Sequence, residues 1–202
     1  MIANGQAAVV CVAGGAQPFD ASPLKPMIRL MTREQLAKRI AEVSLLRGEF
    51  TLRSGRKSNY YLDKYRFETA PDVLQALGAM FAERIGPQVQ RIAGAELGAV
   101  PLAAAAAMAS GKPCIFIRNS KKDYGTAKQI EGILNDGDVV VILEDVLTTG
   151  GQVLEVAKSL TGAGAKIDKI IGVIDRMEGA REAIEAAGYQ FESLFTTKDL
   201  GV

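Results

Sequence analysis

Residues 139–153 read VVVILEDVLTTGGQV, and three parts with different physical properties follow one another along this stretch. The unbroken run of β-branched residues and leucine predicts a strand buried on both faces, as in parallel α/β sheets, with Glu144 and Asp145 at its carboxyl end. Two threonines and two glycines then form a turn, and helical spacing of apolar residues begins at Val153. Backbone N–H groups collect at such a helix start, so the stretch predicts an anion site that suits a phosphate.

On both sides of this stretch, strand patterns alternate with helix patterns. A capping box at Thr32 opens the first helix, and Pro71 and Pro101 are taken as the starts of two others. The sequence predicts helices at 32–46, 71–85, 101–108, 153–160 and 178–187, a hairpin at 50–63, and strands at 91–94, 113–118, 139–145, 167–176 and 189–195. This alternation indicates an α/β fold with a doubly wound, mostly parallel sheet, and the N-terminal third forms a hood.

Composition indicates one globular domain. The chain has 202 residues, of which 48% are hydrophobic and 23% charged, which is enough for a sizeable core. We expect a loose extension at 1–30 and a single domain, hood included, at 31–202. The apolar run at 7–13 is too short to span a membrane and lacks the preceding cations of a secretory signal. A net charge of +1 gives no global field for nucleic acid or an anionic membrane, so neither is an expected partner.

Residue usage also limits the chemistry. The chain has no histidine, which excludes Ser-His and Cys-His nucleophile systems and His-ligated zinc. Magnesium remains available, because it prefers carboxylate, water and phosphate oxygens. Cys11 and Cys114 are too few for a disulfide scaffold, and a reducing cytoplasm is the simplest setting.

Two further segments allow alternative interpretations from their residues alone. The turn at 53–58 gathers three cations and two serines around Gly55, which fits an ordinary charged hairpin or a pocket for a small anion. The polar segment at 119–129 follows the strand that ends at Arg118, and it fits solvated surface or a lid over the carboxyl edge of the sheet.

Two common nucleotide motifs do not account for the central stretch. A Gly-x-x-x-x-Gly-Lys-Ser/Thr motif is absent, and Gly162-Ala163-Gly164 follows a helix where a dinucleotide fingerprint would follow a strand. What remains is a carboxylate pair able to accept hydrogen bonds from sugar hydroxyls, next to backbone amides able to hold a phosphate on the same sugar.

At this point the chain resembles a known family. Residues 139–153 resemble the phosphoribosyl-pyrophosphate signature of the type I phosphoribosyltransferases in the hydrophobic run, the acidic pair and the Thr-Thr-Gly-Gly turn. Residues 50–61 are similar to the N-terminal segment of orotate phosphoribosyltransferases, and 173–179 match their late Asp-Arg element. The resemblance covers about residues 32–198.

The resemblance implies a reaction as well as a fold. A member of this family transfers the 5-phosphoribosyl group from phosphoribosyl pyrophosphate to orotate, giving orotidine 5′-phosphate and pyrophosphate for pyrimidine (UMP) biosynthesis. It implies Mg²⁺ held mainly by substrate oxygens and water, with no direct protein ligand. It also implies a homodimer with shared active sites.

The resemblance assigns roles to particular residues. It implies catalytic roles for Arg118, Lys122 and Asp145, with Lys122 reaching the pyrophosphate in a neighbouring subunit's site. Residues implied to bind phosphoribosyl pyrophosphate are Arg118, Lys122, Tyr124, Glu144, Asp145, Val146, Leu147, Thr148, Thr149, Gly150, Gly151 and Gln152. Residues implied to bind orotate are Arg53, Tyr61, Leu62, Thr148 and Arg176.

The chain departs from the family pattern at four places. Asn119 and Tyr124 replace a common lysine and a common histidine, Arg53 replaces a frequent lysine, and the turn at 95–99 lacks a lysine that many members use near pyrophosphate. The result is less positive charge around the leaving group. Two alternatives stay open at this stage: a salvage phosphoribosyltransferase for another base, and a non-catalytic regulator that senses phosphoribosyl pyrophosphate.

Overall fold

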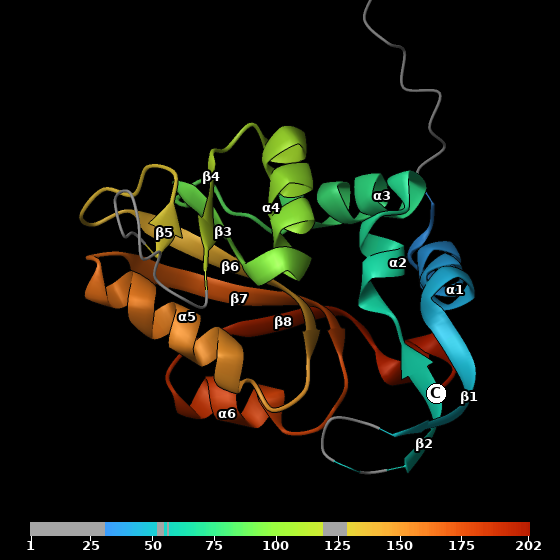
Figure 1. The fold of residues 1–202 in the computed structure, drawn as a ribbon. Helices are drawn as coiled ribbons and strands as arrows, with labels where there is room; N and C mark the ends of the chain where they lie inside the picture. The colour runs from blue at the N-terminus through green and yellow to red at the C-terminus, as the bar shows by residue number, and fades with distance from the viewer. Residues whose placement is uncertain (1–30, 52–54, 56, 119–128) are drawn as a thin grey trace, which may run out of the picture.

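A computed structural model describes residues 31–51, 55, 57–118 and 129–202 (Figure 1). The expected extension at 1–30 lies outside the described residues. In the described part, no helix is both long enough and apolar enough to cross a membrane.

The centre of the molecule is a six-stranded sheet with the strand order β5-β4-β3-β6-β7-β8. Its strands are β3 (Arg91–Ala95), β4 (Cys114–Ile117), β5 (Ile130–Glu131), β6 (Val139–Leu147), β7 (Lys166–Asp175) and β8 (Phe191–Thr196). All neighbouring strands run parallel except the edge strand β5, which pairs antiparallel with β4. The predicted fold class is confirmed, and the predicted central strand lies between β3 and β7.

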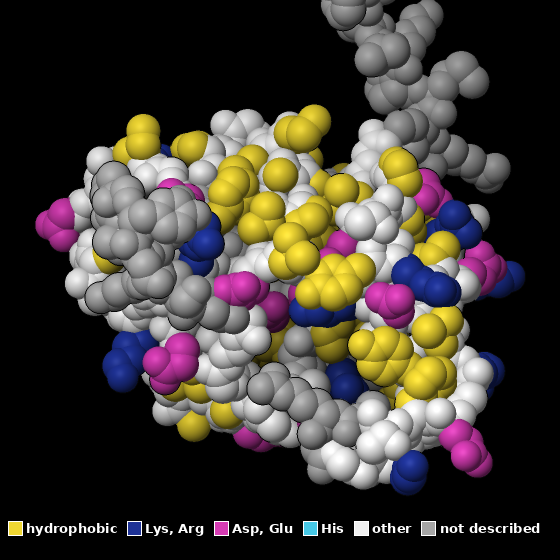
Figure 2. Space-filling view, viewed as in Figure 1, with side chains coloured by type: hydrophobic (Ala, Val, Ile, Leu, Met, Phe, Trp, Pro, Cys, Tyr) yellow, Lys and Arg dark blue, Asp and Glu magenta, His cyan; other side chains and the backbone are white. Residues whose placement is uncertain are grey.

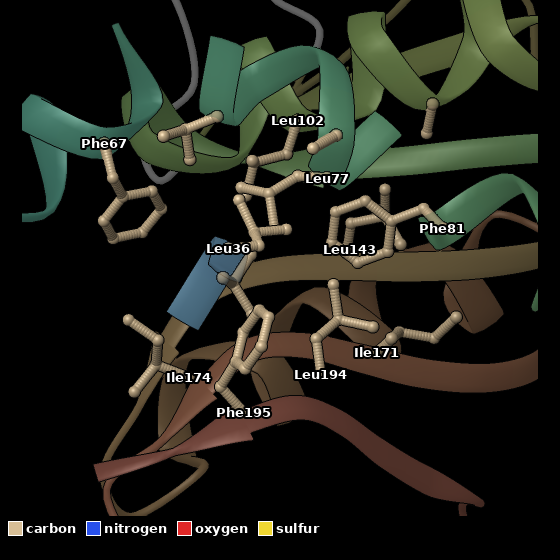
Figure 3. Packing of buried hydrophobic residues seen from close by; sticks show 14 of the residues in the cluster. Leu36, Phe67, Leu77, Phe81, Leu102, Leu143, Ile171, Ile174, Leu194 and Phe195 are labelled. Atoms are coloured by element: carbon tan, nitrogen blue, oxygen red, sulfur yellow. The ribbon is translucent and has the colours of Figure 1, made fainter. Parts of the chain in front are cut away.

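Helices cover both faces of this sheet (Figure 1). The helices α3 (Pro71–Ala82) and α4 (Glu96–Ser110) lie on one face, and α5 (Gly151–Gly162) and α6 (Ala180–Ala186) on the other. Successive side chains of β6 point to opposite faces, so Leu143 joins the core under α3 and α4 while Ile142 joins the core under α5. Figure 3 shows the first core, in which Leu143 lies beside Phe81. Burial on both faces explains the continuous apolar run in β6.

The hood is built from α1 (Arg33–Ser44), β1 (Leu45–Thr51), β2 (Lys57–Leu62) and α2 (Lys64–Glu68). The capping box expected at Thr32 is present at the start of α1. An ion pair of 2.9 Å from Arg33 to Asp199 joins α1 to the C-terminal 3-10 turn η1 (Thr197–Leu200). This arrangement places the antiparallel β1-β2 hairpin at one end of the sheet (Figure 1).

Several predicted boundaries were wrong. The first helix ends at Ser44, before the predicted Leu46, because Leu45 and Leu46 pair with β2. Helix α4 was predicted to begin at Pro101 but begins at Glu96. Pro101 therefore lies inside the helix, where its missing N–H removes only the bond to the carbonyl of Leu97. Helix α3 ends before Ile85, α6 is shorter than predicted and β8 starts at Phe191. The short elements α2, β5 and η1 were not predicted.

Candidate functional site

A pocket of about 160 Å³ opens where β6 ends and α5 begins. It is lined by Lys64 and the continuous segment of residues 144–153, which contains Glu144, Asp145, Val146, Leu147, Thr148, Thr149, Gly150, Gly151, Gln152 and Val153. The segment predicted to hold the activated sugar therefore surrounds one cavity. The roles of its residues remain predictions.

The backbone at the start of α5 is shaped by Gly150. This residue has a φ of +79°, which side chains rarely allow, and a Cβ there would lie 3.2 Å from the carbonyl oxygen of Ala180. The first helical bond runs from the N–H of Leu154 to the carbonyl of Gly150, and no side chain caps the helix. The N–H groups that precede Leu154 stand at the positive end of the helix dipole, which favours an anion.

Both carboxyl groups of the acidic pair on β6 are buried, but they differ in their hydrogen-bond partners. Asp145 is 2% exposed, and its Oδ2 accepts a hydrogen bond of 2.7 Å from Nζ of Lys64. Glu144 is 5% exposed; its Oε1 accepts from the N–H of Asp145, and its Oε2 has no hydrogen-bond partner among the described residues. Burial, and then the charge of Asp145, raises the pKa of Glu144 to about 8. Glu144 is therefore largely protonated at neutral pH.

A third carboxyl group, Glu68 of α2, completes the cluster. It is 2% exposed, and neither carboxyl oxygen has a hydrogen-bond partner in the described chain. Burial, followed by the charge of Asp145, raises the pKa of Glu68 to about 8. Lys64 lies one helical turn earlier, and although burial lowers its pKa, attraction to Asp145 outweighs this and raises the pKa overall. The ammonium of Lys64 thus partly neutralises the cluster.

The start of α4, where the sequence predicted a turn, approaches the same carboxyl groups. A Cβ on Gly98 would collide with Oδ2 of Asp145 and would lie 3.1 Å from Oε1 of Glu68. Glu96, at the start of α4, has a φ of +55°, an uncommon conformation for a residue with a side chain. The close approach of Gly98 therefore brings the backbone at the start of α4 against Asp145.

Sequence reasoning missed Lys64 and Glu68, because both belong to the five-residue helix α2. Their spacing of four residues was the available signal, since it places two side chains on one side of a helix turn. Nothing in the segment itself indicates that this side faces Asp145.

Of the residues predicted to bind orotate, Arg176 lies beside the pocket. Its N–H donates to the carbonyl of Leu147, and its guanidinium pairs with Glu178 at 2.9 Å. The Nε of Arg176 is buried and has no acceptor among the described residues. Leu62, which ends β2, is two residues from Lys64, while the ring of Tyr61 packs against Phe50. Arg176, Tyr61 and Leu62 do not line the 160 Å³ cavity itself.

The remaining predicted residues fall elsewhere. Arg118 is exposed and lies 3.9 Å from Glu131, outside the lining of the pocket. Arg53, Asn119, Lys122 and Tyr124 lie outside the described residues. Within the described ranges, no group of three or more acidic or cysteine side chains is arranged to hold a metal ion.

Several known proteins with similar sequences and folds are named orotate phosphoribosyltransferase. The family model for the phosphoribosyl transferase domain matches residues 66–188. The orotate phosphoribosyltransferase of Methanocaldococcus jannaschii is 43% identical over 169 residues, which cover 83% of this chain and 96% of that protein. The crystal structure of Mycobacterium tuberculosis H37Rv orotate phosphoribosyltransferase with Fe(III) dicitrate has a TM-score of 0.77 at 32% identity, covering 84% of this chain and 99% of that chain. A structure of the same enzyme in complex with 5-phospho-α-D-ribosyl 1-diphosphate has a TM-score of 0.73 at 32% identity, with the same coverage.

Proposed function

This chain belongs to the phosphoribosyltransferase family as an orotate phosphoribosyltransferase, and from that membership we propose the reaction of its pocket. It transfers the 5-phosphoribosyl group from phosphoribosyl pyrophosphate to orotate, giving orotidine 5′-phosphate and pyrophosphate, a step of pyrimidine biosynthesis. A nitrogen of orotate forms the new bond to C1 of the ribose as the bond from C1 to the pyrophosphate oxygen breaks. The sugar carries positive charge in the transition state, so the chemistry requires alignment and charge stabilisation more than proton transfer.

The observation that carries the proposal is the continuity of the pocket lining. A carboxylate pair and a helix N-terminus lie within one cavity, and the residues between them are consecutive in sequence. Asp145 and Glu144 would hold the ribose hydroxyls, while the backbone from Thr148 to Gln152 would hold the 5′-phosphate. These two groups belong to one sugar, so the pocket recognises them together.

Orotate would lie between the pocket and the hood. Arg176 offers its buried Nε to the carboxylate of orotate, and Thr148 lies next to Leu147, to which the backbone of Arg176 is bonded. Arg53, Tyr61 and Leu62 would contact the base from the hairpin. An arginine is suited to this task because the N–H groups of its planar guanidinium can donate two parallel hydrogen bonds to a carboxylate.

Mg²⁺ would be held mainly by oxygens of phosphoribosyl pyrophosphate and by water. When bound, it supplies positive charge that neutralises the departing pyrophosphate. The residues fit an ion held by substrate and water, because Oε2 of Glu144 has no partner in the described chain and is available to form a hydrogen bond with a ribose hydroxyl or a metal-bound water. Arg118 and Lys122 would add charge at the leaving group.

We also propose that the enzyme acts as a homodimer in the cytoplasm, with Lys122 entering the partner's site. Figure 2 shows apolar side chains gathered over α3 and α4. Met108 of α4 is 87% exposed. A shallow apolar groove there is lined by Pro71, Leu74, Gln75, Pro101, Ala104, Ala105, Met108 and Ala109. Such a surface supports association between copies. The free thiol of Cys114 supports a reducing compartment.

The reaction is tested by following orotate consumption with phosphoribosyl pyrophosphate and magnesium. We expect activity with orotate, and none with adenine or uracil, because neither base carries the carboxylate that Arg176 would bind. Asp145→Asn should weaken binding of phosphoribosyl pyrophosphate, measured by calorimetry, while Asp168→Asn on β7 serves as a control. Binding without turnover of orotate would replace this proposal by the sensing or salvage alternative.

A further inference from the structure

Lys64 is the only cation among the residues that line the described pocket. Its ammonium lies 2.7 Å from Asp145, and its side chain is 35% exposed whereas that of Asp145 is 2% exposed. The cation therefore sits toward solvent, on the open side of a buried carboxylate. A lysine in this position is accessible to a ligand that enters the pocket.

Resting on the proposed function, we propose that Lys64 binds the diphosphate group of phosphoribosyl pyrophosphate. In this structure its ammonium is held by Asp145. When the ribose hydroxyls bind Asp145, the ammonium turns from that carboxylate to the diphosphate on C1.

The chemistry of the ligand places the diphosphate close to Lys64. The diphosphate is attached to C1, the carbon next to the one that carries the 2-hydroxyl, whereas the 5-phosphate is at the other end of the sugar. A cation beside the hydroxyl-binding carboxylates is therefore nearer to the diphosphate than to the phosphate held at the start of α5. The flexible four-carbon stem of a lysine allows the small shift that is required.

The residues around Asp145 explain why a cation is needed there to bind a diphosphate. Gly98 and Lys64 approach the same oxygen of Asp145, so the first residues of α4 and Lys64 share one side of the pocket. Residues 95–98 contribute Glu96 and no cation, and Glu68 adds a further carboxyl group. Among the residues that line the described pocket, Lys64 alone carries a positive charge that can offset a diphosphate. It would supply charge that the turn at 95–99 lacks.

Two ligands distinguish this role from a structural one. Phosphoribosyl pyrophosphate and ribose 5-phosphate share the hydroxyls and the 5-phosphate, but only the first carries a diphosphate. If Lys64 contacts the diphosphate, Lys64→Met weakens binding of phosphoribosyl pyrophosphate by roughly 10- to 100-fold, the usual value of a charge-assisted hydrogen bond, and changes ribose 5-phosphate binding little. If Lys64 only positions Asp145, both ligands lose affinity equally.

The experiment uses the full chain with magnesium and measures both affinities by calorimetry, with thermal unfolding as a check on folding. Lys64→Arg should retain most of the affinity for phosphoribosyl pyrophosphate, and Lys64→Gln replaces Lys64→Met if the latter does not fold. Lys38→Met, on the exposed side of α1, is the matched control. An equal loss for both ligands, or no loss for either, overturns the proposal.

Orotate is absent from these measurements, so the result is independent of the acceptor. A wild-type chain that binds phosphoribosyl pyrophosphate but does not consume orotate refutes the proposed function and still decides the role of Lys64. A wild-type chain that does not bind phosphoribosyl pyrophosphate refutes both.

Discussion

Raising the pH from about 5.5 to about 7.5 should destabilise this protein through two buried glutamates. Burial, and then the charge of Asp145, raises the pKa of Glu68 and of Glu144 to about 8 in the folded state, from an ordinary value of 4.5. The folded state therefore binds protons that the unfolded state has released. The resulting stabilisation is fully present below the unfolded pKa and is lost as the pH rises through 8.

The size of the effect follows from proton linkage. A difference of one bound proton changes the free energy of unfolding by about 1.4 kcal/mol per pH unit. Glu68 and Glu144 interact with each other through Asp145, so we count one proton for the pair, which gives about 2.7 kcal/mol over two pH units. For a domain of this size the melting temperature should fall by roughly 5 to 11 °C. The chain has no histidine, so few other side chains titrate in this window.

Thermal unfolding at constant ionic strength, followed by circular dichroism, measures this dependence. The double variant Glu68→Gln, Glu144→Gln should show a nearly flat melting temperature, because amides of the same shape do not titrate. Glu182→Gln, an exposed change on α6, is the control and should retain the slope of the wild type. A flat wild-type profile, or a double variant that keeps the full slope, would refute the reasoning.

Three other changes test separate parts of the molecule. Gly98→Ala places a methyl group against Asp145, so phosphoribosyl-pyrophosphate affinity measured by calorimetry should fall at least about tenfold; unchanged affinity would contradict the assigned contact. Thr32→Ala removes a capping box shared with Gln35, and urea unfolding should show a loss of about 1 kcal/mol, with no loss contradicting the cap. Lys122→Ala should lower turnover severely at unchanged melting temperature, and near-normal activity would remove the predicted lid residue.

The central part of the fold was predictable because its signals are local. The run in β6 is continuous and apolar since both faces are buried, and the glycines after it fix the start of α5. The end of α1 was not predictable in this way, because Leu46 continues the helical spacing of apolar residues, and only the pairing of Leu45 and Leu46 with β2 extends the backbone. Tertiary contacts overrode the local pattern there.

The same difference between local signals and long-range contacts explains which residues of the candidate site were predicted. The carboxylates and the phosphate turn are contiguous in sequence, so a single stretch revealed them. Lys64 and Glu68 come from a helix of five residues, too short for a periodic pattern, and their importance depends on contact with Asp145, 81 residues beyond Lys64. A residue whose role is created by a long-range contact leaves little local signal.

An acidic cluster is at first sight a poor place to receive a substrate with several negative charges. The protonation states remove the difficulty. Glu68 and Glu144 have pKa values of about 8, so at neutral pH both are largely uncharged, and the charge of Asp145 is matched by Lys64. The cluster then offers hydrogen-bonding oxygens for sugar hydroxyls with little net negative charge to repel a diphosphate. Burial of the two glutamates thus makes the acidic site compatible with its anionic ligand.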